Sequence, residues 1–228
     1  HLDPPPLTAS IAADLICAGL NNNLLAEELS PSLSRLERLL CKWFADRIGL
    51  PIQSGGIIAS GGTLSNLMAL VVARHSLGLQ NDPNIVILAS ADSHVSFLKA
   101  IRVMGLDSSC LQLIDTNKKG QISIDALNNQ LIRLRSEGKK CFAVVATAGT
   151  TVRGSIDPLV ELSELCNKED LWFHIDGAIG GVFALAEKTA SVVNGIGCAN
   201  SVTLNPQKIL GITKTSSLLL VANQSNLI

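Results

Sequence analysis

The spacing of apolar residues changes along the chain, from a helical period before residue 55 to short apolar runs after it. Apolar residues recur with helical spacing over residues 10–18 and 32–48, which predicts two consecutive helices. The second helix would carry its large apolar residues on one face, namely Leu36, Leu39, Leu40, Trp43 and Phe44. Two helices before any strand predict an N-terminal helical arm over residues 1–54. In many enzymes such an arm packs on a partner subunit, so we expect a homodimer.

From residue 55 onward, short apolar runs alternate with segments of helical period. The expected strands are residues 85–89, 111–114, 142–147, 171–175, 201–204 and 216–221. The expected helices are residues 63–77, 95–104, 124–137 and 159–168. This alternation predicts an α/β domain over residues 55–228, with a mostly parallel sheet and helices on both faces. In such sheets the ligand site lies at the carboxyl ends of the strands.

The composition fits one large domain with an arm and argues against several classes of partner. Of the 228 residues, 47% are hydrophobic and 16% are charged, so the chain can bury a core and is not a disordered segment. The formal net charge is −1 and no cluster of Lys or Arg occurs, which argues against nucleic acid or an anionic membrane as the main partner. No apolar stretch reaches the length of a membrane span.

The six cysteines show no metal-binding pattern, and we expect no metal site. The six cysteines stand singly, without a C-x-x-C pair, and most lie in apolar stretches where a thiol packs as a small hydrophobic group. We expect them to be reduced and structural, and we expect the protein to be cytoplasmic.

Asp176 and Lys208 each close an apolar run, over residues 171–176 and 201–208. An acid and a lysine at neighbouring strand ends can hold a pyridinium nitrogen and an aldehyde at opposite sides of one ring, as pyridoxal 5'-phosphate requires. A buried carboxylate favours the protonated ring nitrogen, and burial makes a lysine a better nucleophile by lowering its pKa. Taken alone, the two residues also have ordinary explanations, as a loop cap and a solvated lysine.

Two further segments place polar groups near expected strand ends. Residues 60–66 precede a long apolar helix, so the backbone N–H of Gly62 and the hydroxyl of Thr63 could cradle an anion. The segment is neither a Walker motif nor a dinucleotide-binding motif, and a capped turn is the alternative. His94 follows the expected strand 85–89 and could stack on a flat ring in the cleft, although a capping or packing histidine is also common.

A fifth segment, residues 146–151, brings hydroxyl groups to the same edge of the sheet and leads to Asp157. By itself it could be a turn before an Asp-Pro helix start. A phosphate cradle, an aromatic plate, a carboxylate and a lysine therefore all fall at the strand ends of one sheet. Their joint occurrence favours a cofactor site over unrelated local features.

With these motifs the sequence resembles the pyridoxal-phosphate-dependent group II amino acid decarboxylases, which include the aromatic amino acid, glutamate and L-2,4-diaminobutyrate enzymes. The resemblance runs through nearly the whole chain and rests on residues 60–63, 94–100, 147–151 with Asp157, 174–178 and 205–208. The opening residues 1–6 and 30–32 are most similar to the diaminobutyrate branch. The resemblance implies the large domain of a PLP-dependent transferase-like fold of type I.

The resemblance also implies a reaction, the decarboxylation of an L-amino acid to the corresponding amine and CO₂. Lys208 would form the internal aldimine with pyridoxal 5'-phosphate, and Asp176 would pair with the ring nitrogen of the cofactor. His94 would stack on the exposed face of the ring, and Ala178 would line the opposite face.

The remaining site residues follow from the same resemblance. Gly62, Thr63 and Asn205 would hold the phosphate of the cofactor. Thr151 would lie near the phenolic oxygen of the ring or the carboxylate of the substrate. Asp157 is expected to order its loop instead of touching the cofactor.

Other functions on the same scaffold stay open, because a fold does not fix the type of reaction. One alternative is another pyridoxal phosphate enzyme, such as an aminotransferase, a lyase or an aldehyde synthase. A second is a catalytically inactive homologue that binds the cofactor or dimerises.

The sequence departs from the family pattern at several positions. Gln207 stands where the family usually has histidine, Ile209 stands where an aromatic residue usually follows the lysine, and Asp3 stands where related sequences often have another histidine. Glutamine can donate and accept hydrogen bonds but cannot carry a proton at neutral pH. The chain has no tyrosine and stops at Ile228, before the small C-terminal domain and the tyrosine-bearing loop of the family. We therefore expect a fragment of a longer protein, with a degenerate homologue as the alternative.

Overall fold

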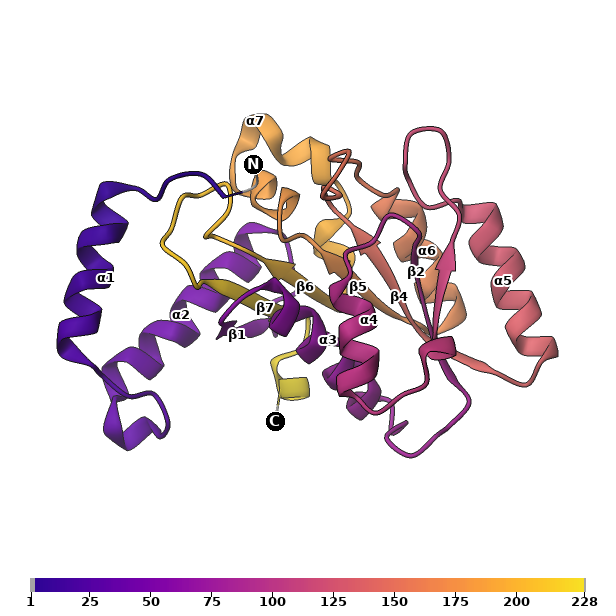
Figure 1. Ribbon diagram of the computed structural model, residues 1–228, viewed down its shortest axis with the longest axis horizontal. Helices are drawn as coiled ribbons and strands as arrows, with labels where there is room; N and C mark the ends of the chain where they lie inside the picture. Colours follow the sequence, from indigo (N-terminus) through magenta and orange to yellow (C-terminus); the bar gives the residue numbers. More distant parts are fainter. Residues whose placement is uncertain (1–2, 228) are drawn as a thin grey trace.

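Seven strands form one sheet at the centre of the protein, in the order β1-β7-β6-β5-β4-β2-β3 (Figure 1). The computed structural model describes residues 3–227, so His1 and Leu2, which carry part of the resemblance at the start of the chain, lie outside the described residues, as does Ile228. The strands are β1 (Gly55–Ala59), β2 (Ile85–Ser90), β3 (Leu111–Ile114), β4 (Lys140–Thr147), β5 (Trp172–Asp176), β6 (Ser201–Leu204) and β7 (Ser217–Val221). β7 runs antiparallel to its neighbours β1 and β6, and the other neighbouring pairs are parallel. The prediction of a mostly parallel sheet is confirmed.

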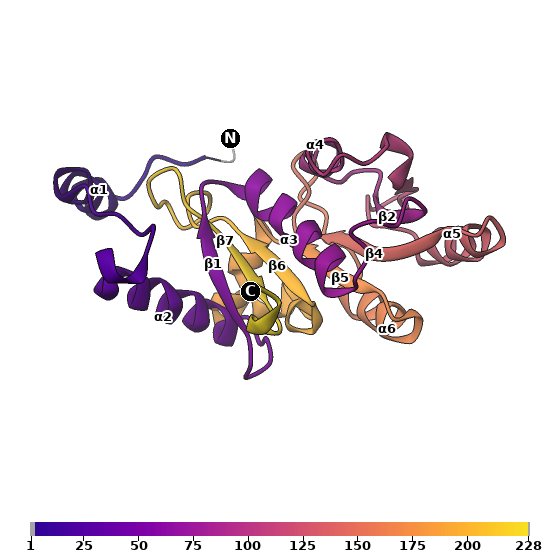
Figure 2. The same cartoon turned by 90° about the horizontal axis from the view of Figure 1, so that it is seen from below.

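Helices cover both faces of this sheet, as predicted, and Figure 2 shows α3 and α4 on one side with α2 and α6 on the other. The α-helices are α1 (Thr8–Leu20), α2 (Pro31–Arg47), α3 (Gly62–Ser76), α4 (Ser96–Val103), α5 (Ile124–Ser136), α6 (Leu159–Glu169) and α7 (Glu187–Ala190). On one face, Leu70 of α3 and Phe97 of α4 pack in a cluster with Ile87 and Val145 of the strands. On the opposite face, side chains of α2, α5 and α6 pack against the alternate strand residues.

The central strands are apolar at nearly every position because both faces of a parallel sheet are covered. All six residues of β2 and all five residues of β5 are buried. Short 3-10 helices fill several connections, namely Glu27–Leu29, Ser108–Cys110, Gly180–Leu185, Ser191–Val193, Ile196–Cys198 and Gln224–Leu227. The predicted strands and helices lie within two residues of the observed bounds, a normal scatter at element ends.

Strand β1 was not predicted from the sequence, because its first two residues are glycines and glycine is depleted in strands. The structure gives one reason for glycine here. A Cβ atom at Gly56 would lie 2.5 Å from the carbonyl oxygen of Leu219 on β7. The close pairing of β1 with β7 therefore requires a residue without a side chain.

The two helices of the N-terminal segment expose apolar side chains. α1 has no buried residue, and Leu15 and Leu20 are 75% and 71% exposed. α2 packs on the sheet through Cys41, Phe44 and Ala45. Of the apolar face predicted for this helix, only Phe44 is buried, and the others are exposed, namely Leu36, Leu39, Leu40 and Trp43. Figure 1 shows α1 at the edge of the molecule, away from the sheet. The division of the chain near residue 54 stays a prediction.

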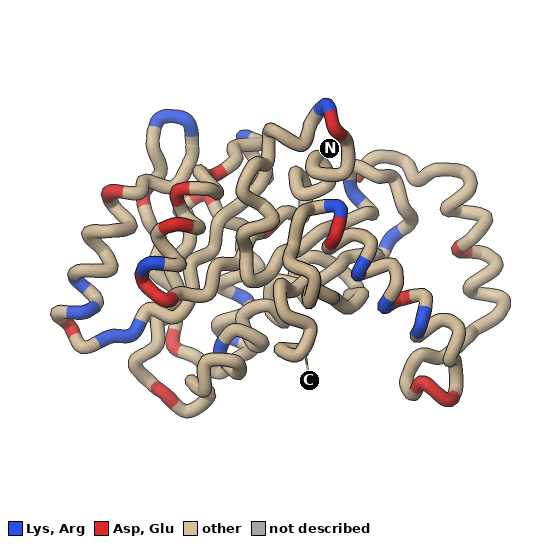
Figure 3. Tube along the Cα trace, turned by 180° about the vertical axis from the view of Figure 1, so that it is seen from behind, with Lys and Arg blue, Asp and Glu red and all other residues tan. Residues whose placement is uncertain are grey.

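Neither the basic nor the acidic residues gather in a large cluster of one sign. Figure 3 shows Lys and Arg interspersed with Asp and Glu along the trace. In the part of the chain that the structure describes, no helix is both long and apolar enough to cross a bilayer. The six cysteines are free, and burial raises the pKa of the Cys41, Cys141 and Cys166 thiols to about 12.

Candidate functional site

The carboxyl ends of β2, β4, β5 and β6 meet the amino end of α3 around a cleft of about 520 Å³. This is the sheet edge at which ligands bind in open α/β folds. All of the predicted site residues line the cleft, namely Gly62, Thr63, His94, Thr151, Asp176, Ala178, Asn205 and Lys208. The structure therefore brings together the segments that the sequence analysis selected.

Asp176 is the last residue of β5 and is 5% exposed. Its Oδ2 atom accepts a hydrogen bond of 2.9 Å from Nδ2 of Asn66 on α3, and its Oδ1 atom accepts one of 3.1 Å from the backbone N–H of Ala178. Among the described residues, no cation forms an ion pair with this carboxylate. Its negative charge can therefore bind a cationic group that enters the cleft.

Two threonines flank Asp176 on the neighbouring strands. Thr147 of β4 and Thr203 of β6 pair in register with Asp176, so all three side chains lie on the same face of the sheet. The hydroxyl oxygens of both threonines are buried without a hydrogen-bond partner among the described residues. Buried hydroxyls normally have a hydrogen-bond partner. The hydroxyl of Thr147, which lines the cleft, is therefore available to form a hydrogen bond with a ligand.

An anion cradle lies where α3 begins. The first N–H groups of a helix have no partner within the helix, and Gly62 and Thr63 open α3 beside Asn205. Oδ1 of Asn205 accepts a hydrogen bond of 2.6 Å from Oγ of Ser217, which leaves its Nδ2 group on the side of Gly62. A Cβ atom at position 62 would lie 2.8 Å from this nitrogen, so a side chain there would fill the cradle.

Lys208 follows β6 in a turn, where its backbone N–H donates to the carbonyl oxygen of Asn205 at 3.0 Å. Burial lowers the pKa of the Lys208 amine, whereas the charges of Asp176 and Asp3 act in the opposite direction. A lowered pKa increases the fraction of neutral amine, the form that attacks a carbonyl carbon. The side chain therefore has the chemistry of a nucleophile.

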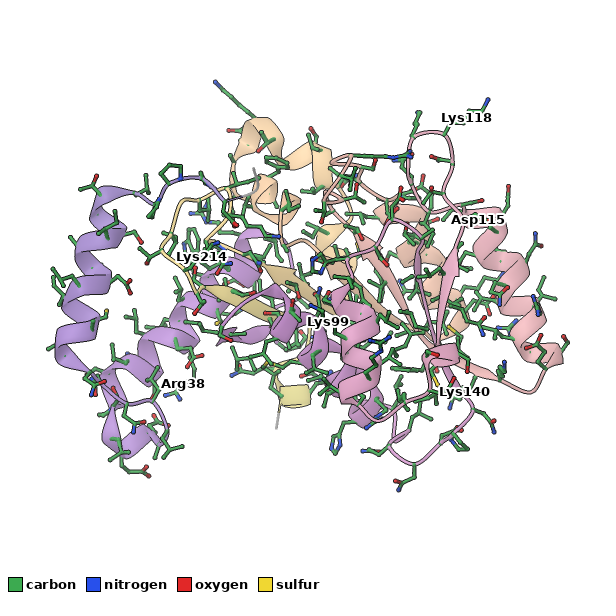
Figure 4. All side chains as sticks on the ribbon, in the orientation of Figure 1. Arg38, Lys99, Asp115, Lys118, Lys140 and Lys214 are labelled. Carbon is green, nitrogen blue, oxygen red and sulfur yellow. The ribbon has the colours of Figure 1, made fainter. Side chains whose placement is uncertain are left out.

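The N-terminal segment fixes the loop that follows Lys208. The backbone N–H of Leu7 donates to the carbonyl oxygen of Gly211 at 2.8 Å, and the Ser10 hydroxyl accepts from the N–H of Thr213 at 2.9 Å. Lys214, labelled in Figure 4, forms an ion pair of 3.0 Å with Asp3, and both residues line the cleft. One wall of the cleft is thus built from residues near both ends of the chain.

His94 and Thr151 lie in loops at the mouth of the cleft. Nδ1 of His94 accepts a hydrogen bond of 3.2 Å from the backbone N–H of Ser96, so a neutral imidazole carries its proton on Nε2. The hydroxyl of Thr151 lies in the exposed turn after β4, whereas Oγ1 of the buried Thr150 accepts from the N–H of Ser155 at 3.0 Å. Thr151 is therefore the hydroxyl of this turn that can meet a ligand.

Asp157 holds the loops below this turn together. Its carboxylate accepts hydrogen bonds of 2.7 Å from the backbone N–H groups of Ile122 and Thr147. Burial raises the pKa of the Asp157 carboxyl, and these two hydrogen bonds act against that shift. The residue orders its loop, as the sequence analysis expected.

Sequence reasoning gave no individual role to several polar residues at this site. Thr147, Asn66 and Ser217 are buried around the predicted residues, and His174 lies two residues before Asp176 on the same face of β5. For Asn66 a signal was present, because it follows Gly62 by four residues and therefore lies on the same helix face.

The arrangement fits pyridoxal 5'-phosphate. The cradle at Gly62 and Asn205 suits a phosphate, the unpaired carboxylate of Asp176 suits a protonated ring nitrogen, and the Lys208 amine suits an aldehyde. The three lie in one cleft. The polar and charged groups in the cleft, as well as the spacing of the motifs, thus match the expected cofactor.

Comparison with known proteins gives consistent matches. Residues 6–228 match the family described as "Pyridoxal-dependent decarboxylase conserved domain". The chain is 36% identical to an aromatic-L-amino-acid decarboxylase of Bacillus atrophaeus over 92% of this chain and 46% of that protein. It is 33% identical to the acidic amino acid decarboxylase GADL1 of Mus musculus over 96% of this chain and 41% of that protein.

A solved structure extends this similarity to the coordinates. The glutamate decarboxylase domain of a diaminobutyrate-pyruvate transaminase and L-2,4-diaminobutyrate decarboxylase from Vibrio parahaemolyticus superposes with a TM-score of 0.94 and 31% identity. The match covers 99% of this chain and 51% of that one. The chain thus spans about half the length of the proteins that it matches.

Proposed function

Because the chain belongs to the family of pyridoxal-dependent decarboxylases, we propose that the full-length protein converts an L-amino acid to the corresponding amine and CO₂, with pyridoxal 5'-phosphate as its cofactor. The observation that carries this proposal is the single cleft shared by the Lys208 amine, the Asp176 carboxylate and the cradle at Gly62. When bound, the cofactor would withdraw electrons from the substrate Cα and so stabilise the charge left there as CO₂ departs.

The two charged side chains have separate tasks. Lys208 would supply the amine that joins the aldehyde carbon of the cofactor, and its lowered pKa supports that role. Asp176 would keep a proton on the ring nitrogen, because a buried carboxylate without another cationic partner favours the protonated form.

The other residues would bind and orient. Gly62, Thr63 and Asn205 would hold the phosphate through N–H and hydroxyl donors, as helix N-termini commonly do. His94 and Ala178, which both line the cleft, would pack against the two faces of the ring. Thr151 would donate to an oxygen of the ring or of the substrate.

Gln207 would place a loop and carry no proton. Its Oε1 atom accepts a hydrogen bond of 2.7 Å from the backbone N–H of Ser216. This contact supports a role in positioning the segment after Lys208, for which an amide suffices.

We also propose that the protein acts as a homodimer. α1 has no buried residue although it carries apolar side chains such as Leu15 and Leu20, and α2 exposes Leu36 and Trp43. A partner subunit that covers these side chains would remove this apolar surface from water. Reduced thiols persist in the cytoplasm, and the six free cysteines support a cytoplasmic location.

The test is CO₂ release by the full-length protein, with the cofactor bound, across a panel of L-amino acids. We expect CO₂ and the matching amine in equal amounts from at least one substrate. Accumulation of pyridoxamine phosphate would indicate an aminotransferase, and an aldehyde product would indicate an aldehyde synthase. No product from any amino acid would favour the inactive homologue.

A further inference from the structure

A buried chain of hydrogen bonds runs beneath the cleft and ends at Asp176. Nε1 of Trp172 donates to Oγ of Ser201 at 2.9 Å, and Oγ of Ser201 lies 2.9 Å from Nδ1 of His174. Nε2 of His174 lies 3.2 Å from Oδ1 of Asn66, whose Nδ2 group donates to Oδ2 of Asp176 at 2.9 Å. All five residues are at most 5% exposed.

The Asp176 end of this chain fixes the direction of the hydrogen bonds as far as a neutral His174. The Trp172 indole can only donate and the Asp176 carboxylate can only accept. Asn66 must therefore turn its amide nitrogen to Asp176, so its oxygen faces His174 and accepts from Nε2–H. Nδ1 of a neutral His174 is then the acceptor for the Ser201 hydroxyl.

The surroundings of His174 keep it neutral. Burial lowers the pKa of its imidazole to about 4, whereas the charge of Asp176 and the backbone of Ser201 act in the opposite direction. Phe97 of α4 packs edge-on at 6.0 Å between ring centroids, and Asn66 faces the ring from α3. Asp176 is thus the charged group beside the ring, and in residues 3–227 no cation forms an ion pair with its carboxylate.

The amide of Asn66 is held from a second side. Its Nδ2 group also donates to Oγ of Ser96 at 2.9 Å, so both of its N–H bonds are used. An amide with all of these partners cannot rotate without breaking several buried hydrogen bonds, which is costly. The direction of the hydrogen bond to Asp176 is therefore fixed.

We propose that Asn66 and His174 are positioning residues: His174, as the neutral Nε2–H tautomer, orients the Asn66 amide, and this amide holds the Asp176 carboxylate in the orientation that binds the ring nitrogen. This inference rests on the proposed role of Asp176. Asn66 lines the cleft, and His174 is fully buried beneath it. Both act through the carboxylate.

The first test is a double-mutant cycle with cofactor affinity as the readout. The dissociation constant of pyridoxal 5'-phosphate is measured by absorbance titration of the full-length apoprotein, for wild type, Asn66→Leu, Asp176→Ala and the double variant. We expect Asn66→Leu to weaken binding about tenfold in the Asp176 background, as for loss of a hydrogen bond to a charged group. In the Asp176→Ala background we expect Asn66→Leu to cause no further loss of affinity.

Asn200→Leu is the matched control. Oδ1 of Asn200 also accepts a hydrogen bond from β5, at 2.7 Å from the backbone N–H of Phe173, but at the end of the strand away from the cleft. We expect this variant to bind the cofactor as wild type does. Circular dichroism of each variant verifies that it is folded.

The outcomes separate this inference from the proposed function. If Asp176→Ala weakens binding and Asn66→Leu then causes an equal loss in both backgrounds, Asn66 does not act through Asp176 and the inference is overturned. If Asp176→Ala alone leaves the affinity unchanged, the proposed role of Asp176 fails and the inference fails with it.

The second test measures the wild-type protein. Imidazole ¹⁵N chemical shifts of the full-length wild-type protein at pH 7 distinguish the two neutral tautomers from the charged form, and loss of the signal in His174→Gln assigns it. We expect His174 to carry a single proton on Nε2. A proton on Nδ1, alone or together with Nε2, would overturn the proposed chain.

Discussion

Gly62 and Asn205, which lie far apart in the sequence, are so close in space that a Cβ atom at position 62 would lie 2.8 Å from Nδ2 of Asn205. Real Cβ contacts are not that short, so Asn205 would have to move. The hydrogen bond of 2.6 Å from Ser217 restrains it. The absence of a side chain at position 62 is therefore part of the anion cradle.

We predict that Gly62→Ala weakens binding of pyridoxal 5'-phosphate about tenfold, the effect of losing about one hydrogen bond to a charged group. Absorbance titration of the full-length apoprotein measures this affinity. Gly19→Ala is the control, because a Cβ atom there would meet no atom within 4 Å. Equal affinity in wild type and Gly62→Ala would contradict the phosphate role of the cradle.

Lys208→Ala should abolish CO₂ release and remove the absorption band that reports a covalent link between cofactor and protein. The physical reason is that no amine remains at this position to bond with the aldehyde carbon. Lys99→Ala, on the exposed side of α4, should retain both (Figure 4). Persistence of the band in Lys208→Ala would show that another amine holds the cofactor.

Asp176→Asn should lower turnover at least tenfold while part of the cofactor stays bound. The substitution keeps the shape of the side chain but removes the charge that favours the protonated ring nitrogen, and tenfold corresponds to about 1.4 kcal/mol. Steady-state kinetics give the turnover number, and the cofactor content of the purified variant gives the fraction of cofactor that stays bound. An unchanged turnover number would argue against a role at the ring nitrogen.

The stability of the apoprotein should fall with acid because His174 is held neutral. Its pKa is lowered from 6.5 to about 4 in the folded state, so the unfolded chain binds more protons between these values. The contribution of His174 is complete above pH 6.5 and is lost as the pH falls through 6.5 toward 4, by about 3 kcal/mol in total.

This pH effect is measured as the difference in unfolding free energy between wild type and His174→Gln from pH 7 to pH 4.5. The difference isolates His174 from the carboxyl groups that titrate in the same range, such as Asp157, whose pKa is raised by burial. Parallel stability curves for the two proteins would show that the imidazole is not held neutral.

Leu15→Asp should shift the full-length protein from dimer to monomer. Leu15 is 75% exposed on α1, and an interface that buries it would have to bury an unpaired carboxylate in the variant. Light scattering gives the mass of each species. Val103→Asp on α4, where Val103 is 71% exposed, is the control and should remain dimeric. A monomeric wild type at working concentration would rule out the proposed homodimer.

Much of the architecture follows from local pattern. Runs such as residues 85–89 and 171–175 are apolar at nearly every position, which is typical of strands covered on both faces, and the structure has them as β2 and β5. The cleft residues could also be predicted from the sequence, because the strand ends of a parallel sheet meet at one edge. Chain order alone could therefore bring Asp176 and Lys208 to one place.

Other features depend on partners that a sequence does not reveal. His174 and Asn66 lie among apolar residues in the chain, and nothing local indicates that their side chains meet. Similarly, Leu36 and Trp43 form an apolar stripe that predicts burial, yet α2 turns a different set, including Cys41, toward the sheet. Periodicity predicts that a face is apolar, but it does not say which surface covers it.

The antiparallel pairing of β1 with β7 determines when the site can assemble during synthesis, as well as where it lies. Gly55 pairs with Val221, and α3, which follows β1, is tied to β7 through the hydroxyls of Ser65 and Ser217 at 2.7 Å. On the ribosome, β1 has no β7 to pair with until residues 217–221 have emerged. The anion cradle, which needs Asn205 braced by Ser217, therefore cannot form before β7 has emerged, however early Gly62 is made.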